Sequence, residues 1–152
     1  YLQINSDYIG CVDDTCLATG ELLPVKDTPF DFNKRKRIGQ DFEADHIQLK
    51  NAFGYDHSFV LNGTENQLTL EEPVSGRRLI ISTTAPVVQV YTGNFLKDGC
   101  IGKAGRVYEN REGVALETQL MPNAINTEEN PSTILRKGDK FESNTKYVFE
   151  IM

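Results

Sequence analysis

Polar side chains interrupt three otherwise apolar stretches of this sequence. Asp56 and His57 stand immediately before one apolar run, and Gln89 interrupts a second run that is rich in valine. Glu117 follows a third apolar run and is separated by one residue from Gln119. A charged carboxylate is costly to bury, so a carboxylate within a strand is usually exposed or functional. If it is buried without a nearby cation, its pKa rises toward neutrality, which suits a general base.

The spacing of these residues limits which of them can share a pocket. Asp56 and His57 are adjacent, so in an extended chain they face opposite sides, whereas Glu117 and Gln119 face the same side. Each residue also has a purely structural explanation. Asp56 could cap a turn, Gln89 could be exposed on a strand with one buried face, and Glu117 could point outward from its strand. Spacing alone therefore predicts a possible carboxylate site and leaves its substrate open.

A hydrophobic period of two dominates the chain and predicts the elements that must position these residues. In residues 67–72, for example, Leu68 and Leu70 fall on one face while Thr69 and Glu71 fall on the other. Residues 73–76 (PVSG) are typical of a hairpin turn. The chain begins in a strand-like segment, where Leu2 and Ile4 alternate with Gln3 and Asn5. We expect further strands at 8–12, 58–62, 67–72, 77–84, 87–92, 114–119 and 145–151.

Helical patterns are few. Residues 41–53 can form one short helix that stops at Gly54, and residues 122–126 can form one helical turn. Closely spaced strands without intervening helices indicate an all-β antiparallel domain, which we expect to be a sandwich. The length of 152 residues suits one domain, spanning residues 1–152.

Composition excludes several classes of function. No apolar run approaches the ~18 residues that a membrane-spanning helix requires, so we expect no membrane partner. The net charge of −6 repels phosphates and argues against nucleic-acid binding. The basic run at residues 34–37 (KRKR) is expected on a solvated loop.

The cysteines indicate neither a disulfide framework nor a metal site. Their number is odd, and with only two histidines, His46 and His57, they complete no zinc-binding pattern. We therefore expect reduced thiols in a cytoplasmic protein without a metal. The three cysteines are Cys11, Cys16 and Cys100.

Taken together, these motifs resemble those of the aldose 1-epimerase family, the galactose mutarotases. The order and spacing of the motifs agree with the family across nearly the whole chain. The matching stretches are residues 2–8, 13–15, 19–21, 28–32, 54–59 (GYDHSF), 89–95 (QVYTGNF), 116–119 (LETQ), 122–126, 131–132 and 135–136.

The resemblance implies a fold, a reaction and a role for each residue. The fold would be a large antiparallel β-sandwich with a sugar cleft on its concave face. The reaction would interconvert the α and β anomers of free aldoses such as galactose and glucose, without a metal or an organic cofactor. Glu117 would be the general base at the anomeric hydroxyl, while Asp56 and Gln89 would bind the sugar.

The resemblance also implies that part of the site lies elsewhere. In the family the general acid is a histidine, and a second histidine and an arginine also line the cleft. All three lie upstream of the stretch that begins at Tyr1, so this chain corresponds to roughly the C-terminal half of a family member. We expect neither His46 nor His57 to replace the acid. An N-terminal half or self-association is then expected to complete the fold. Ala18 is a smaller departure, because the family favours proline before the Thr-Gly-Glu turn.

Three alternatives remain open at this point. The chain could be a non-catalytic carbohydrate-binding remnant, or a structural partner without a sugar site. It could also resemble the hexose-6-phosphate epimerases, which need cations such as Arg77, Arg78 or the 34–37 run at the cleft. An aromatic wall beneath a sugar could come from Tyr55, Phe59 or Tyr91, although core packing is the simpler role for each.

Overall fold

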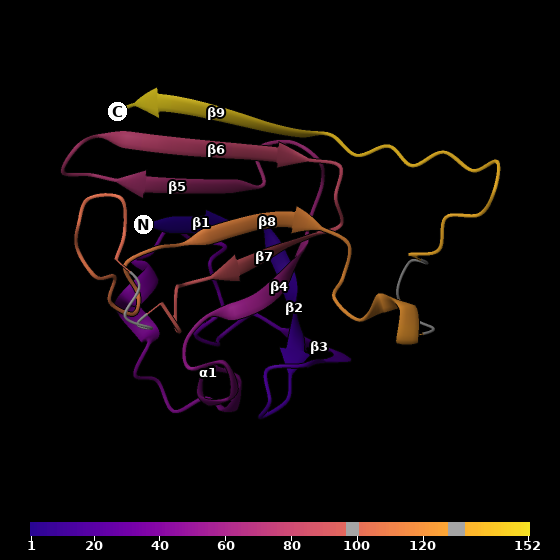
Figure 1. The fold of residues 1–152 in the computed structure, drawn as a ribbon, viewed down its shortest axis with the longest axis horizontal. Coiled ribbons are helices and arrows are strands. Elements are labelled where there is room, and N and C mark those ends of the chain that lie inside the picture. The colour runs from indigo at the N-terminus through magenta and orange to yellow at the C-terminus, as the bar shows by residue number, and fades with distance from the viewer. Residues whose placement is uncertain (97–100, 128–132) are drawn as a thin grey trace.

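Two antiparallel sheets make up this protein in a computed structural model, which describes residues 1–96, 101–127 and 133–152 (Figure 1). The four-stranded sheet has the order β1-β5-β6-β9, and the five-stranded sheet has the order β3-β2-β4-β7-β8. The strands are β1 (Leu2–Ile4), β2 (Ser6–Val12), β3 (Ala18–Pro24), β4 (Asp56–Leu61), β5 (Leu68–Glu72), β6 (Arg77–Thr83), β7 (Val87–Tyr91), β8 (Ala115–Gln119) and β9 (Thr145–Ile151).

The core lies between the two sheets, as the period of two predicts. Leu68 pairs with Ile81 across β5 and β6, and both side chains are fully buried. From the five-stranded sheet, Phe59 pairs with Val88 and meets them from the opposite side. The sandwich predicted from the sequence is therefore confirmed. Further buried members of this core are Leu2, Ile4, Ile9, Val25, Phe30, Phe32, Leu49, Tyr55 and Val90.

Every strand expected from the sequence is present, with ends that agree to within two residues, but β3 is an addition. Its burial pattern does not alternate cleanly, because it is the edge strand of its sheet and most of its side chains are exposed or half-buried. Residues 19–21, interpreted from the sequence as a turn, lie inside this strand. Gly20 is irregular there, with φ of +89°.

The predicted helix at residues 41–53 is wrong in its first half. The helix α1 covers only Ile47–Ala52, and the separate 3-10 turn η1 covers Ile38–Asp41. His46 has an extended backbone and is the N-cap of α1, since its Nδ1 accepts a hydrogen bond from the Gln48 N–H. The segment before it follows the core instead, with Phe42 and Ala44 packed against buried side chains. The single turn predicted at 122–126 is confirmed as η2 (Ala124–Asn126).

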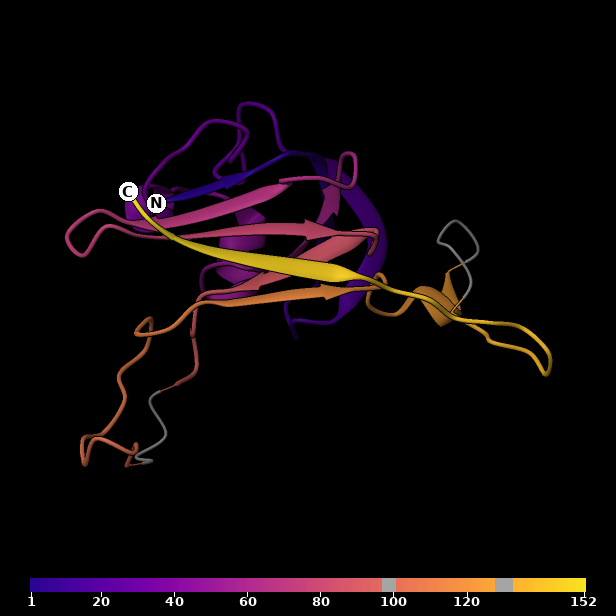
Figure 2. The same cartoon turned by 90° about the horizontal axis from the view of Figure 1, so that it is seen from above.

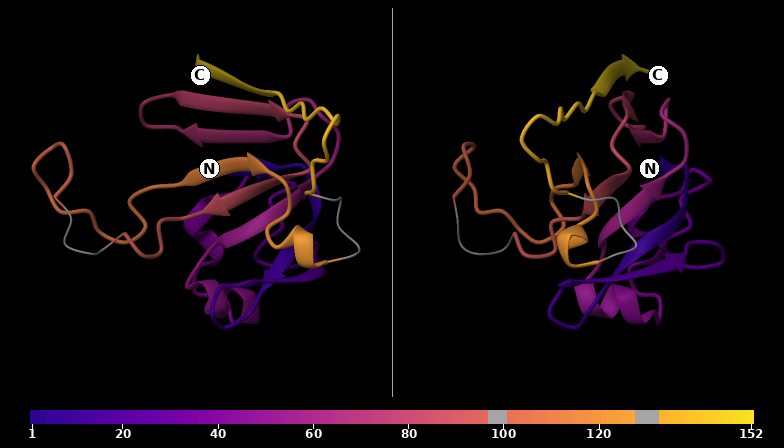
Figure 3. Two further views of the ribbon diagram at one scale, coloured as in Figure 1. Left: turned by 45° about the vertical axis from the view of Figure 1, so that its right-hand side comes forward. Right: turned by 90° about the vertical axis from the view of Figure 1, so that its right-hand side faces the viewer.

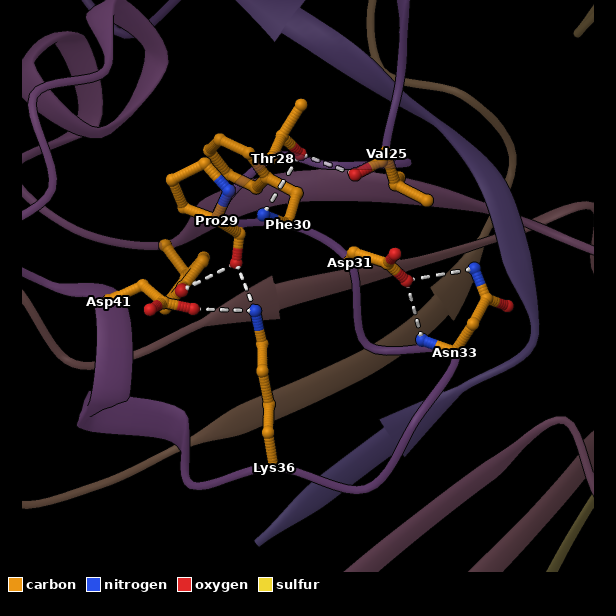
Figure 4. A network of polar contacts seen from close by, with 9 residues as sticks. Val25, Thr28, Pro29, Phe30, Asp31, Asn33, Lys36 and Asp41 are labelled. Atoms are coloured by element: carbon orange, nitrogen blue, oxygen red, sulfur yellow. Dashed lines mark hydrogen bonds and ion pairs between the residues drawn. The ribbon is translucent and has the colours of Figure 1, made fainter.

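The basic run is also less solvated than expected. Lys36 is mostly buried, and its Nζ bonds to the Pro29 carbonyl at 2.6 Å and to Asp41 Oδ2 at 2.8 Å (Figure 4). Arg35 pairs with Glu71 of β5. These contacts fix the loop that carries Phe30 and Phe32 into the core, so two of the four basic residues support the fold.

The inner face of β9 is covered less than the rest of the sandwich. Phe149 pairs with Leu79 and points to the core side, yet 78% of it is exposed. Its neighbours Tyr147 and Ile151 on the same face are also exposed. A hollow of about 760 Å³ is lined by Phe149 and Ile151 together with Val114. Figures 2 and 3 show β9 at the edge of its sheet, with residues 101–113 and 133–143 extending away from the two sheets.

No helix among the described residues has the length and apolar character needed to cross a membrane.

The contrast between the buried core and the exposed inner face of β9 can be tested at two phenylalanines that both face the core side. Replacing the fully buried Phe59 by Ala should lower the free energy of unfolding by about 3–5 kcal/mol, because it removes apolar contacts and leaves a cavity. The matched change Phe149→Ala should cost less than about 1 kcal/mol in the isolated chain, since that ring is mostly exposed. Urea unfolding of both variants measures the difference. Equal losses would contradict the described core.

Candidate functional site

The entry into β4 is fixed by an abrupt end to α1. Phe53 adopts a left-handed conformation with φ of 57°, and its N–H bonds to the carbonyls of Leu49 and Lys50. Gly54 follows with φ of +139°, and a Cβ there would lie 2.6 Å from Asn94 Oδ1. Only glycine satisfies both the backbone and this close approach. The glycine of the 54–59 motif therefore places Asp56 at the first position of β4.

Tyr55 anchors the same turn from within the core. Its ring is fully buried, and its hydroxyl donates to the Pro29 carbonyl at 2.9 Å. The Asn94 amide donates to the carbonyls of Ala52 and Tyr55, which ties the end of α1 to the chain after β7. Tyr55 therefore has the core-packing role and does not line an open face.

Asp56, Ser58 and Gln89 form a hydrogen-bonded chain across β4 and β7. Gln89 Nε2 donates to Asp56 Oδ1 at 2.7 Å, and the Ser58 hydroxyl donates to Gln89 Oε1 at 2.5 Å. Ser58 and Gln89 are direct cross-strand partners, and Asp56 lies two residues from Ser58 on the same face. The amide orientation follows from these bonds, because a carboxylate accepts and cannot donate.

Glu117 extends this line of polar residues onto β8. It is the direct partner of Gln89, so its side chain projects from the same face, and it is exposed. We call Asp56, Ser58, Gln89 and Glu117 the polar row. The structure thus brings together all three site residues predicted from the sequence and adds Ser58, which sequence reasoning missed.

The opposite face of the same strands is the core. His57, Phe59 and Val90 are fully buried there, which confirms that Asp56 and His57 point to opposite sides. His57 Nδ1 accepts the Asp56 N–H at 3.1 Å, and its Nε2 lies 3.2 Å from Gln48 Oε1. Burial lowers the pKa of His57 to about 3, so the ring is neutral at physiological pH.

Apolar groups adjoin the polar row on its own face. Val60 and Val87 follow the row along β4 and β7, and they pack with Met121 and Ala124 near η2. Gly10 of β2 lies beneath this cover, since a Cβ there would come within 3.1 Å of Met121 Sδ. At the other end, Tyr91 lies beside Asp56 as its direct cross-strand partner. Tyr91 is half-buried, and its hydroxyl accepts the Phe95 N–H at 3.0 Å. The row is therefore flanked by apolar side chains at both ends.

Two arginines considered for a phosphate site lie away from the row. Arg78 of β6 pairs with Glu71, and Arg77 donates to the Ser75 hydroxyl, so both lie on the other sheet. Within the described part of the chain, no three His, Cys, Asp or Glu side chains are arranged to hold a metal ion. Cys11 and Cys16 are free thiols. Cys100 and the 131–132 motif lie outside the described residues.

Comparisons with known proteins identify the family to which this chain belongs. The family model described as aldose 1-epimerase matches residues 1–148. The chain belongs to the aldose 1-epimerase family. It is 37% identical to the galactose mutarotase of Homo sapiens over 153 residues, which cover 99% of this chain and 43% of the human protein. It is 35% identical to the aldose 1-epimerase of Escherichia coli K12 over 154 residues, covering 97% and 44% of the two chains.

Solved structures agree with this assignment to the aldose 1-epimerases. A GalM/aldose epimerase homologue from C. elegans superposes with a TM-score of 0.86 at 31% identity, covering 99% of this chain and 45% of that one. The galactose 1-epimerase from Lactobacillus acidophilus gives a TM-score of 0.69 at 28% identity. The chain thus spans less than half the length of the curated relatives that it matches.

The buried neutral His57 makes stability depend on pH. In the unfolded chain a histidine binds a proton near pH 6.5, whereas the folded chain binds it at His57 only near pH 3. Between these values the unfolded state holds more protons, so the free energy of unfolding falls as the pH falls, by up to about 1.4 kcal/mol per pH unit.

Urea unfolding between pH 7 and pH 5 measures this dependence, because most carboxyl groups titrate below this pH range. The variant His57→Gln should show a flatter profile because it lacks the titrating ring. His46→Gln is the matched control. Its ring is less buried and its pKa is lowered only by that partial burial, so the flattening should be smaller. Parallel profiles for the original chain and His57→Gln would contradict a buried neutral His57.

Proposed function

We propose that this chain carries the sugar-binding groups and the general base of an aldose 1-epimerase, which interconverts the α and β anomers of free aldohexoses such as galactose and glucose. The polar row is the observation that carries the proposal. It presents two carboxylates, an amide and a hydroxyl on one face of three neighbouring strands, with Ser58, Gln89 and Glu117 in register. A sugar offers several hydroxyls at similar spacing, and each requires a donor or an acceptor.

In this proposal Glu117 takes the proton from the anomeric hydroxyl O1. The ring oxygen receives a proton as the C1–O5 bond breaks, which yields the open-chain aldehyde. Rotation about C1–C2 and reclosure then give the other anomer. The exposed position of Glu117 is consistent with a base that must reach a bound ligand. Asp56 and Gln89 hold other hydroxyls, and Tyr91 supplies an apolar surface beside them.

We assign the general acid to a histidine outside this chain. His57 points into the core and His46 caps α1, so neither lies on the face of the polar row. The proposed chemistry needs only a base and an acid, and we propose that no metal or organic cofactor takes part. The free thiols Cys11 and Cys16 are in keeping with a cytoplasmic location, which we also propose.

The polypeptide that supplies this acid is proposed to pack against the inner face of β9. The chain is then one part of a single larger sandwich domain. Relatives contain more than twice the matched length, and the inner face of β9 exposes Tyr147, Phe149 and Ile151. Apolar side chains gathered on the core side of a sheet are typical of a surface that another segment covers. The proposed occupant corresponds to the N-terminal part of the relatives.

The role of Glu117 is tested by polarimetry with freshly dissolved α-D-galactose. Replacing Glu117 by Gln should reduce the acceleration of mutarotation by about 10²-fold or more, because Gln cannot accept the proton. Glu65→Gln, an exposed change in the turn after β4, should leave the rate unchanged. Both variants are measured in the chain alone and in its complex with the N-terminal part of human galactose mutarotase. A Glu117→Gln protein that keeps its full rate would overturn the assignment.

Coexpression tests the proposed partner. The part of human galactose mutarotase that precedes its 153 matched residues should co-elute with this chain in size-exclusion chromatography and raise its mutarotase rate. Phe149→Asp should abolish co-elution, because it places a charge in an apolar interface. Val74→Asp, at a fully exposed turn, is the matched control and should not. If the chain instead forms a homodimer that Phe149→Asp dissociates, the inner face of β9 binds a second copy of this chain.

A further inference from the structure

His57 is a buried ionisable group without a role in the proposed chemistry. Its ring is enclosed by the core and contacts Phe30 edge-on, with 4.7 Å between the ring centroids. Burying a polar ring costs free energy unless its nitrogens are hydrogen-bonded. Both nitrogens are paired here, and one of them is paired with the backbone of a polar-row residue.

Contacts around Gln48 determine which nitrogen of His57 carries the proton. Gln48 Oε1 accepts the Val12 N–H at 2.8 Å, and Gln48 Nε2 donates to the Val12 carbonyl at 3.1 Å. This pair of bonds to β2 fixes the amide with its oxygen toward His57. His57 Nε2, at 3.2 Å from that oxygen, must therefore be the protonated nitrogen. Nδ1 is left with a lone pair, which accepts the Asp56 N–H.

We propose that His57 is a positioning residue that holds Asp56 for sugar binding, and that Gln48 keeps it in the required Nε2–H tautomer. This inference rests on the proposed sugar-binding role of Asp56. On the open face, Gln89 donates to the Asp56 carboxylate. On the core face, the His57 ring accepts the Asp56 backbone N–H. A neutral ring is needed for this contact, since protonation would remove the acceptor at Nδ1. Burial lowers the pKa of His57 far enough to keep the ring neutral.

Two amide variants separate positioning from simple core packing. In His57→Asn the side-chain oxygen lies near the place of Nδ1, so an acceptor for the Asp56 N–H is retained and the bond to Gln48 is lost. In His57→Gln the amide reaches Gln48 but leaves no acceptor near Asp56. Positioning predicts that His57→Gln has the larger effect on the site. Packing alone predicts the reverse, because Asn is smaller and leaves the larger cavity.

NMR spectra of the 152-residue chain provide the first readout. Long-range ¹⁵N spectra at pH 7 should show an unprotonated Nδ1 and a protonated Nε2 for His57. The Gln89 side-chain amide should change its shifts and exchange faster in His57→Gln than in His57→Asn. The Gln67 amide, buried just before β5 and bonded to the carbonyls of Thr83 and Gly63, should be unchanged in both variants and reports an intact fold.

Sugar affinity provides the second readout. His57→Gln should weaken D-galactose binding, measured as Kd or KM, by about tenfold, which is the size expected from losing one hydrogen bond between neutral groups. His57→Asn should stay within about threefold of the original chain. The turnover number should change less than KM in both variants, because Glu117 lies on another strand.

The outcomes distinguish the inference from the function on which it rests. A His57 protonated at Nδ1, or a larger effect of His57→Asn on Gln89, would overturn the positioning role whether or not the sugar binds. The Gln89 amide could change as expected in the variants while galactose neither binds nor is turned over. That result would overturn the proposed function and the role of Asp56 and His57 in sugar binding. It would leave His57 as the residue that orients Asp56.

Discussion

The antiparallel register of β4, β7 and β8 is the constraint on which the rest of the structure depends. Ser58, Gln89 and Glu117 are direct partners across these strands, and the intervening residues form the core. A shift of one residue in either pairing would move a polar side chain into the core and an apolar one to the open face. The hydrophobic pattern that stabilises the sandwich therefore also determines the composition of the site.

The polar groups near this register are paired on both sides of the sheet. On the core side, His57 and Gln48 are hydrogen-bonded to each other, and Gln48 also pairs with the backbone of Val12. On the open face, Gln89 is held between Ser58 and Asp56. Paired polar groups in a low-dielectric setting are held rigidly, whereas unpaired ones would destabilise the fold. The two sets meet at Asp56, whose backbone belongs to one and whose carboxylate belongs to the other.

The sequence predicted most of the fold because alternation along a strand is a local property. It predicted the strands around Leu68, Ile81 and Phe59, and the separation of Asp56 from His57. It missed β3, where an edge position removes the burial contrast that alternation needs. It extended α1 too far, because Phe42 and Ala44 pack against the core from a non-helical segment that precedes the helix. Ser58 and Gln48 were missed because hydrogen bonds between distant segments leave no pattern in either segment alone.

The edge position of β9 has a consequence for how the molecule opens. β9 is bonded along one side only, to β6, and additional contacts come from Thr145 at its start, which meets Thr83 and Thr118. Beyond that point its apolar side chains are poorly covered. Amide protection should therefore decrease from Thr145 toward Ile151, and this strand can detach in a subglobal fluctuation while β4 and β7 remain paired. The C-terminal edge and the polar row then belong to separate cooperative units of a single sandwich.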